Sequence, residues 1–190
     1  MVSSEPLFIL LVLAVAAERL AELVVSSRHV RAAKAAGGVE RGLGHYPAMV
    51  ALHTGLLVAA VVEVAVADRP FLPWLGWPML ALLVASHALR WWCISTLGRR
   101  WNTRIVVIPG MPLVDRGPYR WLRHPNYVAV VVEGIALPLV HTAWITAVAF
   151  TVLNAVLLRV RIRAEEDALS SASASIHERA SAVGSPSPRA

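Results

Sequence analysis

Two polar segments in the C-terminal half of the sequence carry the side chains best suited to chemistry, at residues 99–127 and 159–166. Within the first, Pro125 is placed to open a helix, because proline at the first helical position gives up only an N–H that has no partner there. Arg123 and His124 then lie at a helix N-terminus, where free N–H groups and the helix dipole favour an anionic or acceptor-rich ligand. The simpler alternative is that the arginines contact lipid headgroups and that His124 caps the helix.

The second segment closes the last apolar run with basic and then acidic residues. A helix turns by about 100° per residue, which sorts these side chains onto different faces. One face holds Arg159, Arg163 and Glu166, and a different one holds Asn154, Arg161 and Glu165. Taken alone, this pattern is also typical of a helix end stabilised by charge pairs three and four residues apart.

The apolar stretch of residues 127–158 joins the two segments and is too long for one comfortable membrane crossing. A break between Pro138 and Thr142 predicts a helical hairpin of two short, tilted spans. Because a hairpin brings its two ends together, we expect both polar segments to meet at one membrane-facing pocket. The side chains expected to converge there are Tyr119, His124, Arg163, Glu165 and Glu166.

The composition places this pocket in a membrane protein. Hydrophobic residues make up 57% of the 190 residues and charged residues only 16%, where soluble domains have roughly 25% charged residues. The net charge of +6 does not indicate nucleic acid, because long apolar runs separate the basic clusters. The single cysteine excludes an intramolecular disulfide, and no histidine pair has the spacing of a metal site, so we expect no bound metal.

Five apolar runs predict five transmembrane helices, since about 20 helical residues cross the bilayer core. The expected spans are about 6–25, 47–67, 74–97, 127–140 and 142–160. Basic residues after the first, third and fifth spans predict an orientation in the membrane with the N-terminus outside and the pocket and C-terminus cytoplasmic. Residues 1–169 form one membrane domain, and the Ser- and Ala-rich residues 170–190 predict a disordered tail.

Several ionisable side chains fall inside the predicted spans, where such groups are functional candidates by default. His87 and Arg90 are three residues apart and share a helix face, so they are candidates for part of the pocket. Asn126 and Glu133, seven apart, also share a face. Pairing between helices is the alternative for Glu133. The remaining ionisable residues within these runs are His53, Glu63 and His141.

These blocks resemble a known family. Residues 117–127, the hairpin and residues 161–166 are similar to the C-terminal half of the isoprenylcysteine carboxyl methyltransferase family, over about residues 101–169. Members are integral-membrane enzymes that use S-adenosylmethionine. Residues 18–23, 37–40 with 45–47, and 97–103 further resemble a bacterial branch associated with type III polyketide synthases, whose members methylate alkylpyrones and alkylresorcinols. That likeness covers nearly the whole chain except the tail.

The resemblance implies an all-α membrane fold with a cytoplasmic cofactor pocket. It implies that Glu165 or Glu166 holds the polar end of S-adenosylmethionine, and the choice between the two carboxylates stays open because the acidic run here is shorter than in eukaryotic members. Arg163, facing the acceptor, and Tyr127 are the candidate catalytic residues. The residues expected to wrap the cofactor are Met111, Pro112, Leu113, Val114, Tyr119 and His124.

The predicted activity is methyl transfer to an oxygen of a lipophilic acceptor that enters between the spans. A long-chain polyketide such as an alkylpyrone is the first candidate, with a polyketide synthase as a partner, and a prenylated carboxylate is the second. A carboxylate or a pyrone enolate can be held by an arginine without a base, whereas a phenol needs one, and His124 or Tyr119 is then the candidate. Two alternatives remain, a membrane NADPH-dependent lipid reductase and a non-catalytic membrane scaffold.

Overall fold

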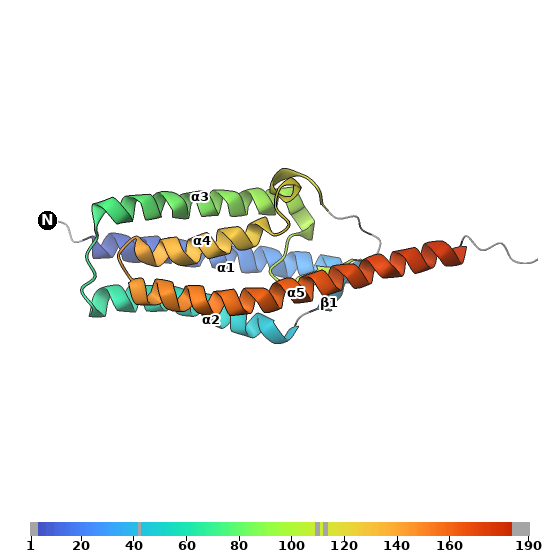
Figure 1. Cartoon of the computed structure of the whole chain (residues 1–190), viewed down its shortest axis with the longest axis horizontal. Coiled ribbons are helices and arrows are strands. Elements are labelled where there is room, and N and C mark those ends of the chain that lie inside the picture. Colours follow the sequence, from blue (N-terminus) through green and yellow to red (C-terminus); the bar gives the residue numbers. More distant parts are fainter. Residues whose placement is uncertain (1–3, 42, 109–110, 112–113, 184–190) are drawn as a thin grey trace, which may run out of the picture.

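The structure is a bundle of five α-helices with short loops at one end and long polar connections at the other (Figure 1). This computed structural model describes residues 4–41, 43–108, 111 and 114–183. The α-helices are α1 (Glu5–Ala35), α2 (Tyr46–Val66), α3 (Pro73–Leu97), α4 (Pro125–Leu139) and α5 (Trp144–Val183). The remaining elements are the strands β1 (Val39–Arg41) and β2 (Ile105–Val107) and the 3₁₀ turns η1 (Leu43–His45), η2 (Gly98–Arg100) and η3 (Gly117–Arg120).

Three of the described helices are long and apolar enough to cross a membrane. These segments are Tyr46–Val66, Pro73–Arg100 and Trp144–Ala168, with mean hydropathies of 2.1, 1.3 and 1.8. They make the chain a membrane protein, as its composition predicts. The 15 residues of α4 span about 22 Å, less than the bilayer core of about 30 Å. Charged residues interrupt the apolar face of α1, so five crossings stay a prediction.

The helical hairpin expected from the apolar stretch of residues 127–158 is formed by α4 and α5. The break falls where the sequence indicates, because α4 ends at Leu139 and α5 begins at Trp144. Thr142 occupies the turn with a φ of 55°, and its Oγ1 donates a 2.8 Å hydrogen bond to the carbonyl of Pro70. This contact ties the hairpin turn to the loop between α2 and α3.

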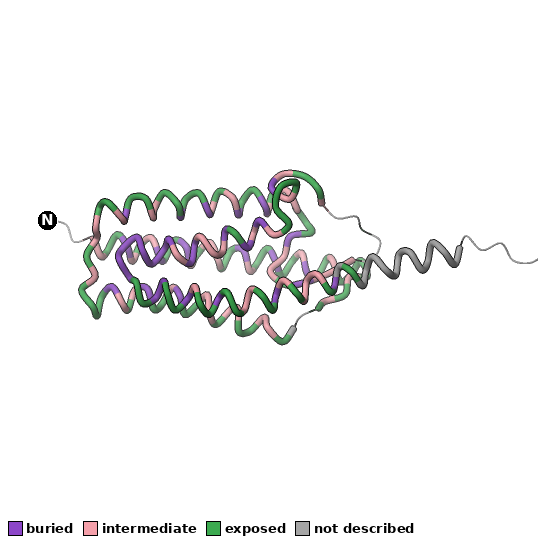
Figure 2. The backbone as a smooth tube through the Cα atoms, in the orientation of Figure 1, coloured by how far each residue is buried: buried purple, intermediate pink, exposed green. Residues whose placement is uncertain are grey.

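The helix α4 is the most enclosed part of the bundle, as the buried positions in Figure 2 show. It packs against α3 and α5, and the closed end of the bundle around it is filled with apolar side chains. This core contains Phe8, Val12 and Val15 of α1, Ala60 and Val64 of α2, Leu83 of α3, and Ala136 and Leu137 of α4. The apolar core therefore anchors one end of the hairpin and leaves its polar end to form a site.

Gly134 sets the distance between the two helices of the hairpin. A Cβ atom there would lie 2.0 Å from Cε1 of Phe150, whose side chain is buried, whereas a Cβ at Gly55 on α2 would meet nothing within 4 Å. We expect Gly134→Ala to lower the free energy of unfolding by about 1–3 kcal/mol through overpacking. Gly55→Ala should leave it unchanged or raise it by up to about 1 kcal/mol. Unfolding in detergent measures both, and equal effects would contradict this packing.

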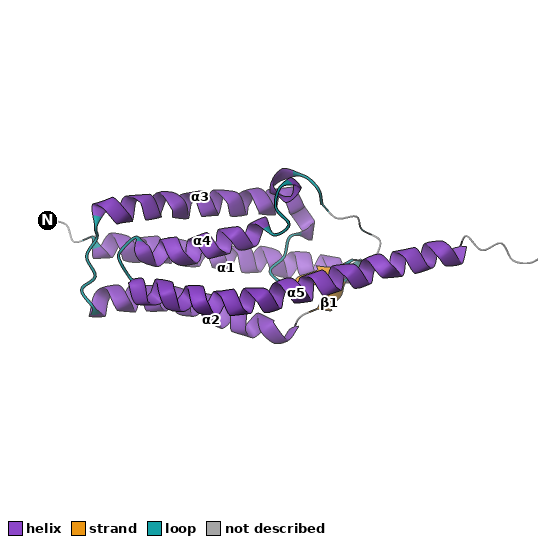
Figure 3. Cartoon of the chain, in the orientation of Figure 1, coloured by secondary structure: helices purple, strands orange, loops and turns teal. Residues whose placement is uncertain are grey.

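One short sheet adds to the predicted all-helical class. β1 and β2 pair antiparallel, with Val39 opposite Val107 and Arg41 opposite Ile105 (Figure 3). The strands have three residues each, too few to show an alternating pattern in the sequence. Their pairing holds the polar loop after α3 against the loop after α1.

The C-terminal segment also differs from its prediction. Disorder was expected for residues 170–190, but α5 continues as a helix to Val183. Alanine, glutamate and arginine are good helix formers, and a helix that is already nucleated adds residues without a new nucleation cost. Low hydrophobicity therefore does not end α5 at residue 170. Residues 184–190 lie outside the described part of the chain.

Candidate active site

A cavity of about 670 Å³ lies at the polar end of the bundle, beside the hairpin's open end. We call it the polar cavity. Its walls come from the loop after α3, the turn η3, the first turn of α4 and the segment of α5 between Arg161 and Ser170. The volume is within the usual range of about 300–1,000 Å³ for small-molecule sites.

Most of the sequence-predicted cofactor residues line this polar cavity. They are Met111, Val114, Tyr119, His124, Glu165 and Glu166. The candidate catalytic residue Tyr127 lines it as well. Pro112 and Leu113 lie outside the described residues. Arg163 is exposed and is not among the residues that line the cavity.

The two ends of the hairpin meet through His124, Tyr127 and the glutamate pair. The Tyr127 hydroxyl donates a hydrogen bond to Glu165, and the His124 ring stacks on the Tyr127 ring with centroids 5.3 Å apart. Nδ1 of His124 lies 3.9 Å from Glu165, and its Nε2 lies 3.6 Å from Glu166. The convergence that the hairpin predicts is thus present at this site for four of the five side chains, Arg163 being the exception.

Arg161 lines the polar cavity, whereas the predicted Arg163 does not. The side chain of Arg161 is buried, and its Nε donates a 2.9 Å hydrogen bond to the Tyr127 hydroxyl. Its two Nη atoms reach the Thr103 carbonyl at 2.6 Å and the sulfur of Met49 at 2.7 Å. The helical-face pattern contains this signal, because it separates Arg161 from Arg163. The family resemblance favours Arg163 instead.

A second cavity, of about 280 Å³, lies deeper among the helices and is named here the bundle cavity. It is enclosed by α1, α2, α4 and α5, mostly through apolar side chains. These include Leu20, Leu23, Leu57, Val130 and Leu157. Asn154, from the same face of α5 as Arg161, also lines it and is buried. Such a lining suits an apolar ligand with a few polar groups.

The polar cavity and the bundle cavity share one wall. Five residues line both of them: Trp101, Asn102, Asn126, Tyr127 and Arg161. Two ligands bound on either side of this wall are therefore held within a few side-chain lengths of each other. Asn126 Oδ1 in this wall is buried and has no hydrogen-bond partner among the described residues. The arrangement can bring a polar ligand and an apolar ligand to one point.

Tyr119 does not suit the role of a base that the sequence left open. Burial raises the pKa of its hydroxyl well above the usual value, so the side chain stays protonated at physiological pH. Tyr119 lines the polar cavity and is not among the residues of the bundle cavity, and the same is true of His124. Tyr119 can therefore donate a hydrogen bond to a ligand in the polar cavity. It does not suit the role of a base for an acceptor in the bundle cavity.

Glu40 fixes the outer wall of the polar cavity. This carboxylate of β1 receives Lys34 from α1 and, at 3.0 Å, Arg104 from the loop before β2. The hydrogen bond from Lys34, with that from Arg104, holds the pKa of Glu40 below its usual range. The ion pairs of Glu40 with Lys34 and Arg104 hold β2 in position. Val106 and the neighbouring Ile108, which line the cavity, are held with it.

Fold and cavities together define a helical membrane protein with a polar cavity and a mostly apolar cavity that share one wall. The chain belongs to the isoprenylcysteine carboxyl methyltransferase (ICMT) family, whose sequence profile matches residues 79–171. The matched region contains most of α3, the polar loop and the hairpin through the glutamate pair. Membership supports methyltransferase activity, and methyltransferases of this family generally use S-adenosylmethionine.

Two bacterial relatives extend the likeness over most of the chain. The Bacillus subtilis protein YpbQ is 38% identical over 164 residues, which cover 86% of this chain and 96% of YpbQ. A Haemophilus influenzae protein is 29% identical over 155 residues, covering 80% of this chain and 88% of that protein. Neither name states a substrate. The relatives therefore do not test the resemblance to the polyketide-associated branch.

Proposed function

We propose that this chain is an integral-membrane enzyme that transfers a methyl group from S-adenosylmethionine to an oxygen of a lipophilic acceptor. The observation that carries the proposal is the wall shared by the polar cavity and the bundle cavity. A water-soluble methyl donor and a membrane-borne acceptor have to meet from opposite sides. Positioning alone supplies a large part of the barrier reduction when the reacting atoms are held in line.

The residues of the polar cavity fit S-adenosylmethionine. The cofactor supplies an electrophilic methyl group on a sulfonium, and it carries a cationic amino group. Glu165 and Glu166 offer negative charge to that amino group, and Tyr119 and Met111 line the same cavity. Nε2 of His124 and Oδ1 of Asn126 are buried without hydrogen-bond partners among the described residues and can meet the cofactor's polar groups.

Within the glutamate pair, Glu166 is the better candidate for the cofactor's amino group. Glu165 already accepts the hydrogen bond from Tyr127, whereas Glu166 has only contacts of 3.6 Å with Arg123 and His124. Glu165 then keeps Tyr127 in place at the shared wall. This division of roles leaves Arg161 to face the acceptor, in place of Arg163 from the resemblance.

A long-chain polyketide such as an alkylpyrone or alkylresorcinol suits the bundle cavity. Its apolar lining accommodates the first part of an alkyl chain, and the polar side chains at the shared wall accommodate an oxygen-bearing head. A prenylated carboxylate is the second candidate. In this proposal the polar cavity faces the cytoplasm, as the basic loops indicate, and a polyketide synthase supplies the acceptor.

Equilibrium binding to the purified chain in detergent tests the cofactor. We expect saturable binding of S-adenosylhomocysteine and none of NADPH. Glu166→Gln should weaken that binding at least about tenfold, since a charge-assisted contact is worth roughly 1.5–3 kcal/mol. The matched control is Asp167→Asn, an exposed neighbour outside the cavity lining, which should bind as the wild type does.

The two alternatives give different results in the same experiment. Binding of NADPH alone would indicate a membrane reductase. Binding of neither ligand would favour a non-catalytic scaffold. Equal losses in Glu166→Gln and Asp167→Asn would remove Glu166 from the site without deciding against the cofactor.

A further inference from the structure

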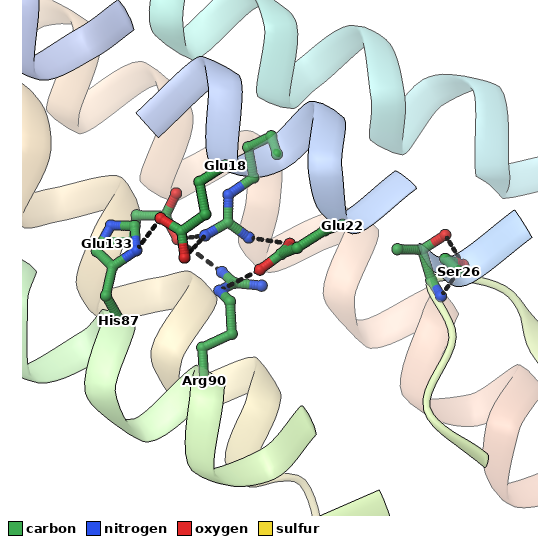
Figure 4. A network of polar contacts seen from close by, with 8 residues as sticks. Glu18, Glu22, Ser26, His87, Arg90 and Glu133 are labelled. Atoms are coloured by element: carbon green, nitrogen blue, oxygen red, sulfur yellow. Dashed lines mark hydrogen bonds and ion pairs between the residues drawn. The ribbon is translucent and has the colours of Figure 1, made fainter. Parts of the chain in front are cut away.

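Six charged or titratable side chains form a cluster between α1, α3 and α4, away from the polar cavity (Figure 4). We call it the ionic cluster. Its shortest contacts, each 2.6 Å, join Arg19 to Glu22, Arg90 to Glu133, and His87 to Glu18. Arg19 also lies 3.4 Å from Glu133. The cluster therefore links three helices.

The ionic cluster borders the bundle cavity through Arg19, Glu22 and Arg90. Glu22 is 6% exposed, and one of its oxygens, Oε2, is held by Arg19. The other oxygen, Oε1, is buried and has no hydrogen-bond partner among the described residues. It lies 3.9 Å from Nε of Arg90, which is too long for a hydrogen bond.

An unpartnered buried carboxylate oxygen is unfavourable, by about 1–3 kcal/mol or more, unless a donor reaches it. A donor that enters the cavity lined by Glu22 can reach this oxygen. The carboxylates of Glu18, Glu22 and Glu133 outnumber the guanidiniums of Arg19 and Arg90 by one. Because the cavity is lined mostly by apolar side chains, the donor that fits it is a hydroxyl on an apolar ligand.

Glu22 is also near the shared wall. It precedes Ser26 by one turn of α1, a rise of about 6 Å. Ser26 in turn accepts a 2.8 Å hydrogen bond from the backbone N–H of Thr103, the residue after Trp101 and Asn102 in the wall. The hydroxyl of a ring bound against this wall is thus within reach of Glu22.

We propose that Glu22 is the general base that takes the proton from a hydroxyl of the acceptor, which therefore enters as a neutral phenol or enol. This inference rests on the proposed function and selects a hydroxyl acceptor over a carboxylate. The acceptor's O–H bond breaks and its proton goes to Oε1 of Glu22. The acceptor oxygen takes the methyl group from the sulfonium, and the electron pair of the broken carbon–sulfur bond stays on sulfur.

The ionic cluster suits this step. The guanidiniums of Arg19 on α1 and Arg90 on α3 face Glu22, and Glu133 of α4 faces the same arginines. When Glu22 takes up one proton, two carboxylates remain against the two guanidiniums. Protonation of Glu22 therefore balances these charges.

Absorbance of a bound probe tests the base without the cofactor. The probe is a long-chain alkyl nitrophenol, whose phenolate absorbs visible light, added to the purified chain at a pH one unit below the probe's own pKa. We expect the wild type to bind it as the phenolate and Glu22→Gln to bind it as the neutral phenol. A neutral spectrum in the wild type would overturn the proposal, even if Glu22→Gln failed to fold.

Methyl transfer to an alkylresorcinol gives the second readout. We expect Glu22→Gln to lower the rate about 10²-fold or more near pH 7, with the loss shrinking as the pH approaches the acceptor's own pKa. Glu22→Asp should recover part of the rate. Glu18→Gln is the control, because it removes an equal charge from the same cluster at a residue that does not line the bundle cavity. It measures the structural effect of losing one carboxylate from the cluster.

The outcomes separate this inference from the proposed function. A wild type that transfers methyl groups while Glu22→Gln matches Glu18→Gln at every pH would overturn the base and leave the methyltransferase. A wild type that binds no S-adenosylhomocysteine and transfers nothing would overturn both.

Discussion

Replacing Arg161 by glutamine is expected to lower methyl transfer by about a hundredfold or more, because a misplacement of about 1 Å at a reacting centre has an effect of that size. Arg161 donates to the Tyr127 hydroxyl and to the Thr103 carbonyl, two groups at the wall between the cavities. Glutamine is too short to reach both and removes the buried positive charge. Glu166 and the other polar-cavity residues proposed to hold the cofactor are unchanged, so binding of S-adenosylhomocysteine should change less than the rate.

Arg163→Gln is the matched comparison for Arg161→Gln. Both variants remove one arginine from the same turns of α5, but Arg163 is exposed and lines neither cavity. The geometry predicts the larger loss at Arg161, whereas the family resemblance predicts it at Arg163. Initial rates at saturating cofactor distinguish the two. A hundredfold loss in Arg163→Gln with little loss in Arg161→Gln would contradict the site described above.

Removing Arg90 is expected to have the largest effect on stability. Its Nη2 lies 2.6 Å from Glu133 and the residue is 5% exposed, so Arg90→Met leaves Arg19 as the single guanidinium facing the buried carboxylates of Glu22 and Glu133. Breaking a buried pair in this way lowers the free energy of unfolding by about 3–5 kcal/mol. Unfolding of the purified chain in mixed micelles measures this loss.

A double variant shows whether the loss comes from the charge left behind. Arg90→Met combined with Glu133→Gln removes both members of the pair, so it should be less destabilised than Arg90→Met alone. The partly exposed pair of Arg69 and Glu63 at the other end of the bundle provides a comparison, and Arg69→Met should have a smaller effect. Additive losses in the double variant would contradict a direct coupling between Arg90 and Glu133.

The helices and the hairpin follow from local rules, which explains why the sequence predicts them. Prolines open α1, α2, α3 and α4, and the break before Trp144 follows from the polar residues of the turn. The pairing of β1 with β2 has no such signal, since its residues are 64 or more apart and each strand is only three residues long. Long-range pairing of short strands depends on the packed helices around it.

Most of the residues that line the polar cavity could be predicted from the sequence, but the position of Arg161 among them could not. Tyr119, His124 and the glutamates line the cavity because hairpin geometry brings them together, a rule that needs only the position of the turn. The choice between Arg161 and Arg163 depends on how α5 is rotated against α4. The partners of Arg90 and Glu22 likewise lie on other helices, so the ionic cluster emerges only when the bundle is assembled.

Transfer of a labelled methyl group is the most direct test of the central claim. The purified chain in lipid nanodiscs is supplied with S-adenosylmethionine labelled in its methyl group and with an alkylresorcinol, an alkylpyrone or a prenylated carboxylate. We expect label in the hydroxyl lipids, a product in which a methyl group replaces one hydrogen, and little product with Arg161→Gln. Absence of labelled lipid with all three acceptors, from a protein that still binds the cofactor, would contradict it.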